Sequence, residues 1–189
     1  MNPVTHFLAG WLIANVNHLE RRDRALVTLA AIIPDVDGLG ILSDIAVKDQ
    51  GTDLAFYGQY HHVLAHNLFF GLLLVASGYF LSKKKGLTTF LVFLGFHIHL
   101  LGDLLSGRGP DGTIWTISYL FPVLTAVQFS WSGQWELNAW PNVVITAIAL
   151  LLMLYLAWRR GYSPVNIFSV KADGAVVAAL RSRFPYRHT

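Results

Sequence analysis

Residues 32–41, IIPDVDGLGI, interrupt an apolar stretch with a proline, two aspartates and two glycines. A charged side chain at bilayer depth costs at least ~2.5 to 3.5 kcal/mol. Pro34 disfavours helical geometry at Ile33, while Gly38 and Gly40 permit unusual dihedral angles. The stretch therefore predicts a broken helix. It should border a hydrated pocket, because non-helical backbone is tolerated at this depth only against protein or a water cavity.

The composition around this stretch is typical of a membrane protein. Hydrophobic residues make up 54% of the chain and charged residues 13%, against roughly 25% charged residues in soluble domains. Five segments approach the ~20 apolar residues that cross a bilayer: 3–18, 25–47, 63–82, 87–106 and 141–158. Segment 114–130 is a sixth or a re-entrant element. We therefore expect an all-α fold, a polytopic membrane helical bundle of five to six transmembrane or re-entrant helices.

The basic residues predict an orientation. All 14 Lys and Arg residues except Lys48 and Arg108 lie in three groups, at 21–24, at 83–85 and from 159 onward. Because Lys and Arg concentrate in cytoplasmic loops, segment 107–140 should lie outside. Its tryptophans are interpreted as interfacial anchors: Trp115, Trp131, Trp135 and Trp140.

This orientation divides the chain into two regions. We expect a membrane-embedded helical domain over 1–160, which carries the site, and a basic cytoplasmic tail over 161–189. The tail either lies along the anionic inner leaflet or is disordered. The expected location is a bacterial or archaeal plasma (inner) membrane, with multiple passes and a cytoplasmic C-terminus. Topology accounts for the net charge of +3 without nucleic acid as a partner, and the expected partner is membrane lipid.

Ionisable residues from four predicted helices fall at one depth. Counted at ~1.5 Å per residue from the cytoplasmic ends, they stand ~17 to 27 Å into a hydrocarbon layer ~30 Å thick. These residues are His6, Asp35, His66, His99 and Asp103. A shared layer predicts one site in the outer half of the membrane.

The residue types and spacings indicate a metal site. His99 and Asp103 are four apart, so on a helix they project from one face. His62 and His66 have the same spacing, whereas His61 reaches the site only from a cap or loop before the helix. The chain has no cysteine, and imidazole with carboxylate suits Zn²⁺, Mn²⁺ or Fe²⁺ better than Ca²⁺ or Mg²⁺.

The candidate ligands are too many for one catalytic ion, which normally takes about three protein ligands. They are His6, Asp35, Asp37, His61, His62, His66, His99 and Asp103. We expect two divalent ions, zinc first with manganese or iron as alternatives, and a bridging aspartate. Two metals ~3.5 to 4 Å apart are the usual apparatus of phosphoester hydrolysis.

Roles for individual residues follow from this expectation. The predicted catalytic residues are Asp35, Asp37, His66 and Asp103, with a spare His or Asp carrying the proton. Arg108, in the loop SGRGPDG, is the predicted contact to a substrate phosphate oxygen. For His97 and His18 we prefer hydrogen bonding to metal binding.

Four motifs resemble a known family. They are THFLAG (5–10), IIPDVD (32–37), HHVLAHNL (61–68) and HIHLLGDLLSGRG (97–109). In this order they resemble the LexA-regulated, inner-membrane, predicted metal-dependent hydrolase family (YdjM-like), over roughly residues 1 to 125. That family is distantly similar to zinc-dependent phospholipase C, which implies phosphoester hydrolysis.

The resemblance also assigns residues. The family's HRGxTH motif falls on His61 to His66, and its HxxxD motif falls on His99 and Asp103. This chain has His62 where arginine is usual, and Gly38 where a histidine frequently follows the aspartate. The family pattern favours His61 as the ligand, while helical spacing favours His62, so both stay candidates.

Three functions fit these residues. The first is an integral-membrane hydrolase with an outward-facing dinuclear site that acts on a phosphate ester, lipid or lipid-linked. The second is a transporter of divalent metal or protons, which would continue polar residues toward the cytoplasmic helix ends. Those ends are almost wholly apolar in 70–82 and 87–96, which favours a one-sided pocket. The third is a structural or regulatory protein with a metal-stabilised bundle.

Overall fold

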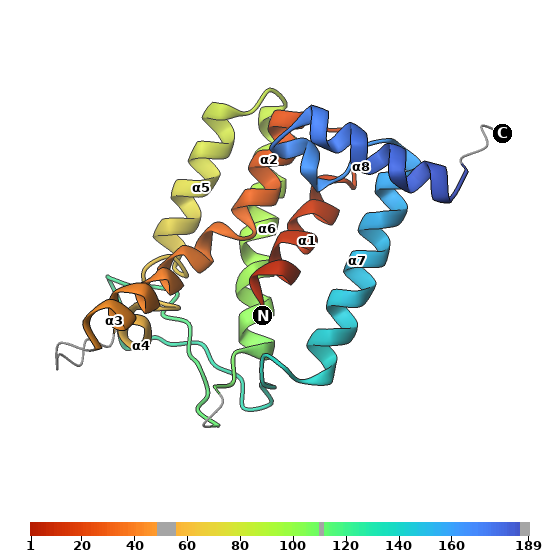
Figure 1. Ribbon diagram of the computed structural model, residues 1–189. Helices are drawn as coiled ribbons and strands as arrows, with labels where there is room; N and C mark the ends of the chain where they lie inside the picture. Colours follow the sequence, from red (N-terminus) through yellow and green to blue (C-terminus); the bar gives the residue numbers. More distant parts are fainter. Residues whose placement is uncertain (49–55, 110–111, 186–189) are drawn as a thin grey trace.

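The computed structural model describes residues 1–48, 56–109 and 112–185 (Figure 1). Every regular element in this part of the chain is a helix, and the only strand-like pairings there are isolated bridges. The elements are α1 (Pro3–Ala14), α2 (Arg21–Ala30), the 3-10 helix η1 (Ile33–Leu39), α3 (Gly40–Lys48), α4 (Phe56–Tyr60), α5 (Leu68–Leu81), α6 (Lys85–Ser106), α7 (Trp140–Arg160), the 3-10 helix η2 (Pro164–Ile167) and α8 (Val170–Arg183). The all-α prediction is confirmed.

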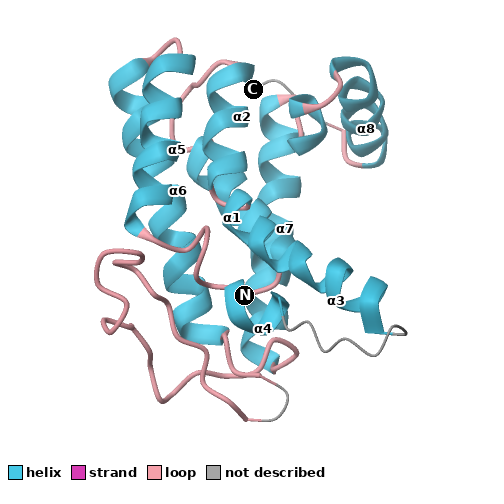
Figure 2. Cartoon of the chain, turned by 90° about the vertical axis from the view of Figure 1, so that its left-hand side faces the viewer, coloured by secondary structure: helices cyan, strands magenta, loops and turns pink. Residues whose placement is uncertain are grey.

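Helix α6 is the centre of a bundle. It packs against α5, α2 and α1, and α1 also packs against α2 and α7. Helix α8 lies across one end of this bundle, and the loop segments 107–109 and 112–139 fold over the opposite end (Figures 1 and 2). The bundle therefore has two different ends, one covered by a helix and the other by loops.

Close backbone contacts hold these helices together. A Cβ atom at Gly10 of α1 would lie 2.7 Å from the Cβ atom of Ala31 and 2.8 Å from the carbonyl oxygen of Thr28. A Cβ atom at Gly71 of α5 would lie 2.5 Å from the ring of Phe96 on α6. Glycine is needed at both positions, because any side chain would push neighbouring helices apart.

The predicted spans are only partly matched. Helices α6 and α7 are long and apolar enough to cross a membrane, and α2 with η1 and α3 makes a third candidate that bends by 47°. Helix α1 has 12 residues and α5 has 14, which correspond to ~18 and ~21 Å, short of a ~30 Å core. Five to six spans are therefore not confirmed. Segment 114–130 contains turns and bridges and no helix.

The shortening of α5 has a local cause. The helix begins at Leu68 because Asn67 caps it, its side chain accepting a hydrogen bond from the Phe70 amide at 3.0 Å. The Asn67 amide group also donates to the carbonyl oxygens of Val63 and Leu64. Residues 61–67 are thereby held in turns, and this part of the predicted span 63–82 is not helical.

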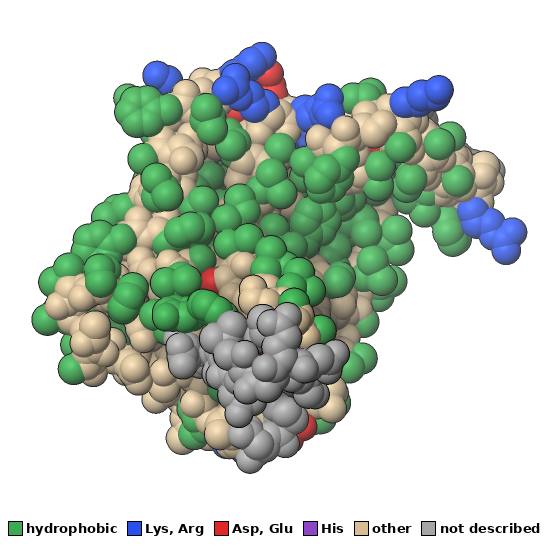
Figure 3. Space-filling model, turned by 60° about the vertical axis from the view of Figure 1, so that its left-hand side comes forward, with side chains coloured by type: hydrophobic (Ala, Val, Ile, Leu, Met, Phe, Trp, Pro, Cys, Tyr) green, Lys and Arg blue, Asp and Glu red, His purple; other side chains and the backbone are tan. Residues whose placement is uncertain are grey.

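The charge distribution distinguishes the two ends. Lys and Arg side chains gather at the end that carries α8 and the α5–α6 turn, above a band of apolar side chains (Figure 3). There, the buried Asp23 of α2 accepts hydrogen bonds from the amides of Lys83 and Lys84 and from the Thr88 hydroxyl, each at 2.9 Å. The predicted tail is folded over 164–183, as η2 and α8.

Candidate metal centre

The carboxylate of Asp103 is the meeting point of three histidines. It lies near the end of α6, away from the basic residues. Its Oδ1 is 3.0 Å from Nε2 of His6, and its Oδ2 is 2.9 Å from Nε2 of His99 and 3.3 Å from Nε2 of His66. All four side chains are at most 2% exposed. Helices α1 and α6 and the turn before α5 thus bring their ionisable residues together, as the sequence predicts.

Two groups of side chains share Asp103. The Asp35 cluster consists of His6, Asp35, His99 and Asp103, and the His62 cluster consists of His62, His66 and Asp103. Within each cluster, one donor atom from every residue lies within 4.8 Å of the others. Each cluster has enough nitrogen and oxygen donors to hold one divalent ion.

The broken helix orients the imidazole of His99. Helix α2 ends at Ala30 and η1 continues the chain in 3-10 geometry, so the predicted break is confirmed. The Asp35 amide donates to the carbonyl of Ile32 instead of that of Ala31, which accepts a 2.9 Å hydrogen bond from Nδ1 of His99. With its proton on Nδ1, a neutral His99 directs the lone pair of Nε2 at the clusters.

Asp37 orients two other imidazoles. Its oxygens accept hydrogen bonds from Nδ1 of His61 at 2.8 Å and from Nδ1 of His66 at 2.9 Å, and one oxygen also accepts from the Ala65 amide. The structure thus places Asp37 and His61 beside the clusters and in neither of them. A carboxylate behind a ligating histidine is the usual outer support of a metal site.

His62 enters its cluster through an unusual backbone conformation. Its φ is 67°, in the left-handed region that residues with a Cβ seldom adopt. Helical spacing is not the reason that His62 lies near His66, because residues 61–67 form turns and no helix. The two alternatives are resolved into two positions: His62 lies in a cluster with His66, and His61 hydrogen-bonds to Asp37.

The donor set fits a metal by its unmet hydrogen bonds. In a neutral ring with Nδ1 protonated, Nε2 is only an acceptor, yet Nε2 of His66 lies 3.0 Å from Nε2 of His99. Among the described residues, the buried atoms Oδ2 of Asp35 and Nδ1 of His62 have no hydrogen-bond partner. Lone pairs that converge without protons require a cation or a shared proton.

Burial and neighbouring charges act differently on the two cluster histidines outside the helices. Burial lowers the pKa of His62 well below its usual value, so its ring is neutral, the form that binds metal. Burial also lowers the pKa of His66, but hydrogen bonds with Asp103 and Asp37 outweigh it and raise that pKa to about 9.

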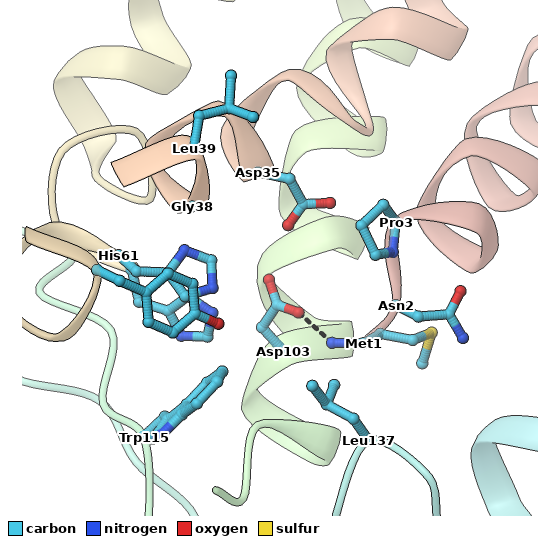
Figure 4. A pocket seen from close by; sticks show the side chains of 12 residues that line it. Met1, Asn2, Pro3, Asp35, Gly38, Leu39, His61, Asp103, Trp115 and Leu137 are labelled. Atoms are coloured by element: carbon cyan, nitrogen blue, oxygen red, sulfur yellow. Dashed lines mark hydrogen bonds and ion pairs between the residues drawn. The ribbon is translucent and has the colours of Figure 1, made fainter. Parts of the chain in front are cut away.

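A cavity of about 280 Å³ adjoins both clusters (Figure 4). Asp35, His61, His62 and Asp103 are among the residues that line it. Its other lining residues are Met1, Asn2, Pro3, Gly38, Leu39, Tyr57, Trp115 and Leu137. The amino group of Met1 contacts Asp103 in this cavity.

Two aromatic residues of the cavity were not predicted. Tyr57 stacks on the ring of His61, with centroids 4.6 Å apart. Trp115 packs edge-on against His61 and His62, at 5.6 and 5.1 Å. The sequence offers no spacing signal for Tyr57. The sequence predicts Trp115 only as an interfacial anchor, since its contact with the histidines depends on how residues 112–139 fold back.

Arg108 is not among the residues that line this cavity. Its guanidinium donates to the carbonyl of Ser132 at 3.1 Å, and its amide donates to the carbonyl of Trp135. In the structure Arg108 therefore lies outside this cavity and holds the segment around Ser132 and Trp135. His97 follows the prediction of a hydrogen-bonded histidine, since it donates to the Phe93 carbonyl and pairs with the Tyr119 hydroxyl.

Comparison with known proteins identified no matching family model, curated protein or solved structure.

Proposed function

We propose that this protein is an integral-membrane, metal-dependent hydrolase of phosphate esters. The observation that carries the proposal is the combination of two donor clusters on a shared carboxylate with an adjoining cavity. A purely structural metal site is closed, with all positions filled by protein. Here a space large enough for a substrate group reaches His62 and Asp103. The order of the four motifs, which resembles YdjM-like proteins, supports the same class.

In this proposal the residues divide the work. Two divalent ions, zinc first, would be held by the Asp35 and His62 clusters, and when bound they would supply Lewis acidity for activating water and neutralising negative charge. Asp103 would contribute its carboxylate to both clusters. His61 faces the cavity with Asp37 behind its Nδ1, so it is suited to accept and return a proton. Tyr57 and Trp115 hold the His61 ring in place.

The orientation follows from the two ends of the bundle. Because Lys and Arg gather at the α8 end, that end is assigned to the cytoplasm. The clusters lie at the opposite half of α6, and the cavity therefore faces outward. Helices α1 and α5 complete a polytopic bundle around the spans α6 and α7, in a bacterial or archaeal inner membrane.

Transport is the second candidate, and the core argues against it. Between the clusters and the basic end, α1, α2 and α6 are joined by an apolar cluster. It contains Ile13, Ala14, Leu19, Val27, Ala30, Leu91 and Val92. The buried hydroxyl of Thr28 in this region donates a hydrogen bond to the Arg24 carbonyl. Such a layer favours a pocket with one entrance over a path across the membrane.

The deciding experiment joins metal analysis to a substrate screen. We expect purified protein to contain about two transition-metal ions per chain and to hydrolyse a phosphoester, and Asp103→Ala to lose both properties. Active protein without metal would defeat the proposal. Metal uptake into proteoliposomes, abolished by the same substitution, would favour transport, and metal-loaded protein without either activity would favour a structural role.

A further inference from the structure

A second cavity extends from the metal clusters along the bundle. It has a volume of about 370 Å³ and lies between α1, α6 and α7. Its lining is Met1, Thr5, His6, Ala9, Leu12, Ile98, Leu101, Gly102, Leu105, Ile145, Ile148, Ala149 and Leu152. All but Thr5 and His6 are apolar or glycine. From Thr5 to Leu12 the groove follows α1 for ~10 Å.

One end of this groove is the metal centre itself. His6 belongs to the Asp35 cluster and also lines the groove. Met1 lines both the groove and the cavity at the clusters. A Cβ atom at Gly102, next to Asp103, would lie 3.0 Å from the His6 ring, so the backbone of α6 forms the floor at this junction.

The side of the groove opens onto an apolar surface. Leu101 is 52% exposed, Ile148 53% and Leu152 47%, and α7 is a candidate membrane span. Exposed apolar side chains on such a helix face lipid chains in a bilayer. A hydrocarbon chain of a lipid can therefore enter the groove from the side without crossing water.

We propose that this groove holds one acyl chain of a phospholipid-type substrate while its phosphate lies at the clusters. The inference rests on the proposed function and narrows its substrate class. The polar and apolar halves of the substrate would meet beside His6, at Met1, which lines both cavities. A lipid phosphate is the matching ligand, because an anion suits the metal positions and a hydrocarbon chain suits the groove.

The chain offers a matched pair of variants for a test. Ala149 lines the groove, and Ala157, two turns further along α7, lines a separate apolar cavity of about 520 Å³ between α1, α7 and α8. Both alanines are buried. Ala149→Leu fills the proposed chain site, whereas Ala157→Leu makes the same change at a cavity whose lining includes no cluster residue.

The experiment measures binding of alkylphosphonates, which are not hydrolysed, to metal-loaded full-length protein by calorimetry. We expect octylphosphonate to bind at least ~10-fold tighter than butylphosphonate, since each added methylene is buried in the groove. Ala149→Leu should remove this preference and retain butylphosphonate binding. Ala157→Leu should keep the preference.

Binding independent of chain length in the wild type would overturn the inference, whether or not Ala149→Leu folds. An equal loss of preference in both variants would overturn it as well. Long-chain preference without hydrolysis of any phosphoester would leave the groove assignment standing and end the hydrolase proposal. Hydrolysis of short phosphoesters without a preference for long alkyl chains would leave the hydrolase proposal standing and end the groove assignment.

Discussion

At the scale of the residue, the candidate metal centre depends on which histidines of α6 face the clusters. His99 reaches both Asp35 and Asp103, whereas His97, two residues earlier, bonds to Phe93 and Tyr119. We predict that His99→Gln lowers metal affinity by more than ~100-fold, beyond the cost of losing an outer partner. His97→Gln should keep the full metal content. Elemental analysis after dialysis measures both, and equal losses would contradict the assignment.

Asp37 should behave differently from a ligand. Because it holds two imidazoles through their Nδ1 protons, Asp37→Asn should weaken metal binding by ~10- to 100-fold without abolishing it. Asp44→Asn is the control, since Asp44 accepts hydrogen bonds from the amides of Phe56 and Tyr57 and is in neither cluster. Competition with a chelator of known affinity measures both variants. Complete loss of metal in Asp37→Asn would instead identify Asp37 as a direct ligand.

Metal affinity should fall as the pH falls. The pKa of His66 is raised to about 9 in the metal-free protein, so at neutral pH the incoming ion must displace a proton from this ring. If one proton leaves per ion, the apparent affinity drops about tenfold per pH unit below that pKa. Calorimetry in buffers of different ionisation enthalpy counts the released protons. A pH-independent affinity between pH 7 and 9 would contradict this prediction.

At the scale of the element, the close contact of α1 with α2 positions His6. Gly10→Ala places a Cβ atom within 2.8 Å of the Thr28 backbone oxygen, so we expect a loss of ~1 to 3 kcal/mol in unfolding free energy. Gly86→Ala is the control: a Cβ atom there has no neighbour within 4 Å, and alanine favours helix by ~0.5 to 1 kcal/mol. Thermal unfolding in detergent compares the two. Equal stability of both variants would show that α1 can move freely.

The sequence predicted the elements better than their limits. Long, mainly apolar stretches predict α6 and α7 because such stretches fix a helix's length, and proline and glycine predict the break at Pro34 because they act locally. Apolar content alone predicts too early a start for α5, since the capping role of Asn67 depends on a turn that such content does not reveal. Donor residues were found from their depth and spacing. The sequence does not predict which of these residues belong to a cluster and which only hydrogen-bond to a cluster histidine, because this depends on which ring nitrogen contacts Asp37.

At the scale of the whole molecule, the two ends of the bundle should face opposite sides of the membrane. The chain has no cysteine, so single cysteines report their own location. We predict that Ser132→Cys, in loop 107–139, reacts with an impermeant maleimide on intact bacterial cells. Ser182→Cys, on α8, should react only after the cells are opened; both serines are exposed. Labelling in the opposite order would invert the assigned orientation.

The break between α2 and η1 also determines which ring nitrogen of His99, on another helix, carries the proton. In a continuous helix the Ala31 carbonyl would be occupied by the amide four residues ahead, and the imidazole of His99 would lose its acceptor. Because the Asp35 amide bonds to the Ile32 carbonyl in the 3-10 turn, the Ala31 oxygen stays free for a side chain of another helix. A mutation that restored a continuous α-helix here would therefore remove the acceptor for the Nδ1 proton of His99, and the ring could rotate or change tautomer. Metal binding would then weaken although every donor side chain remained in the sequence.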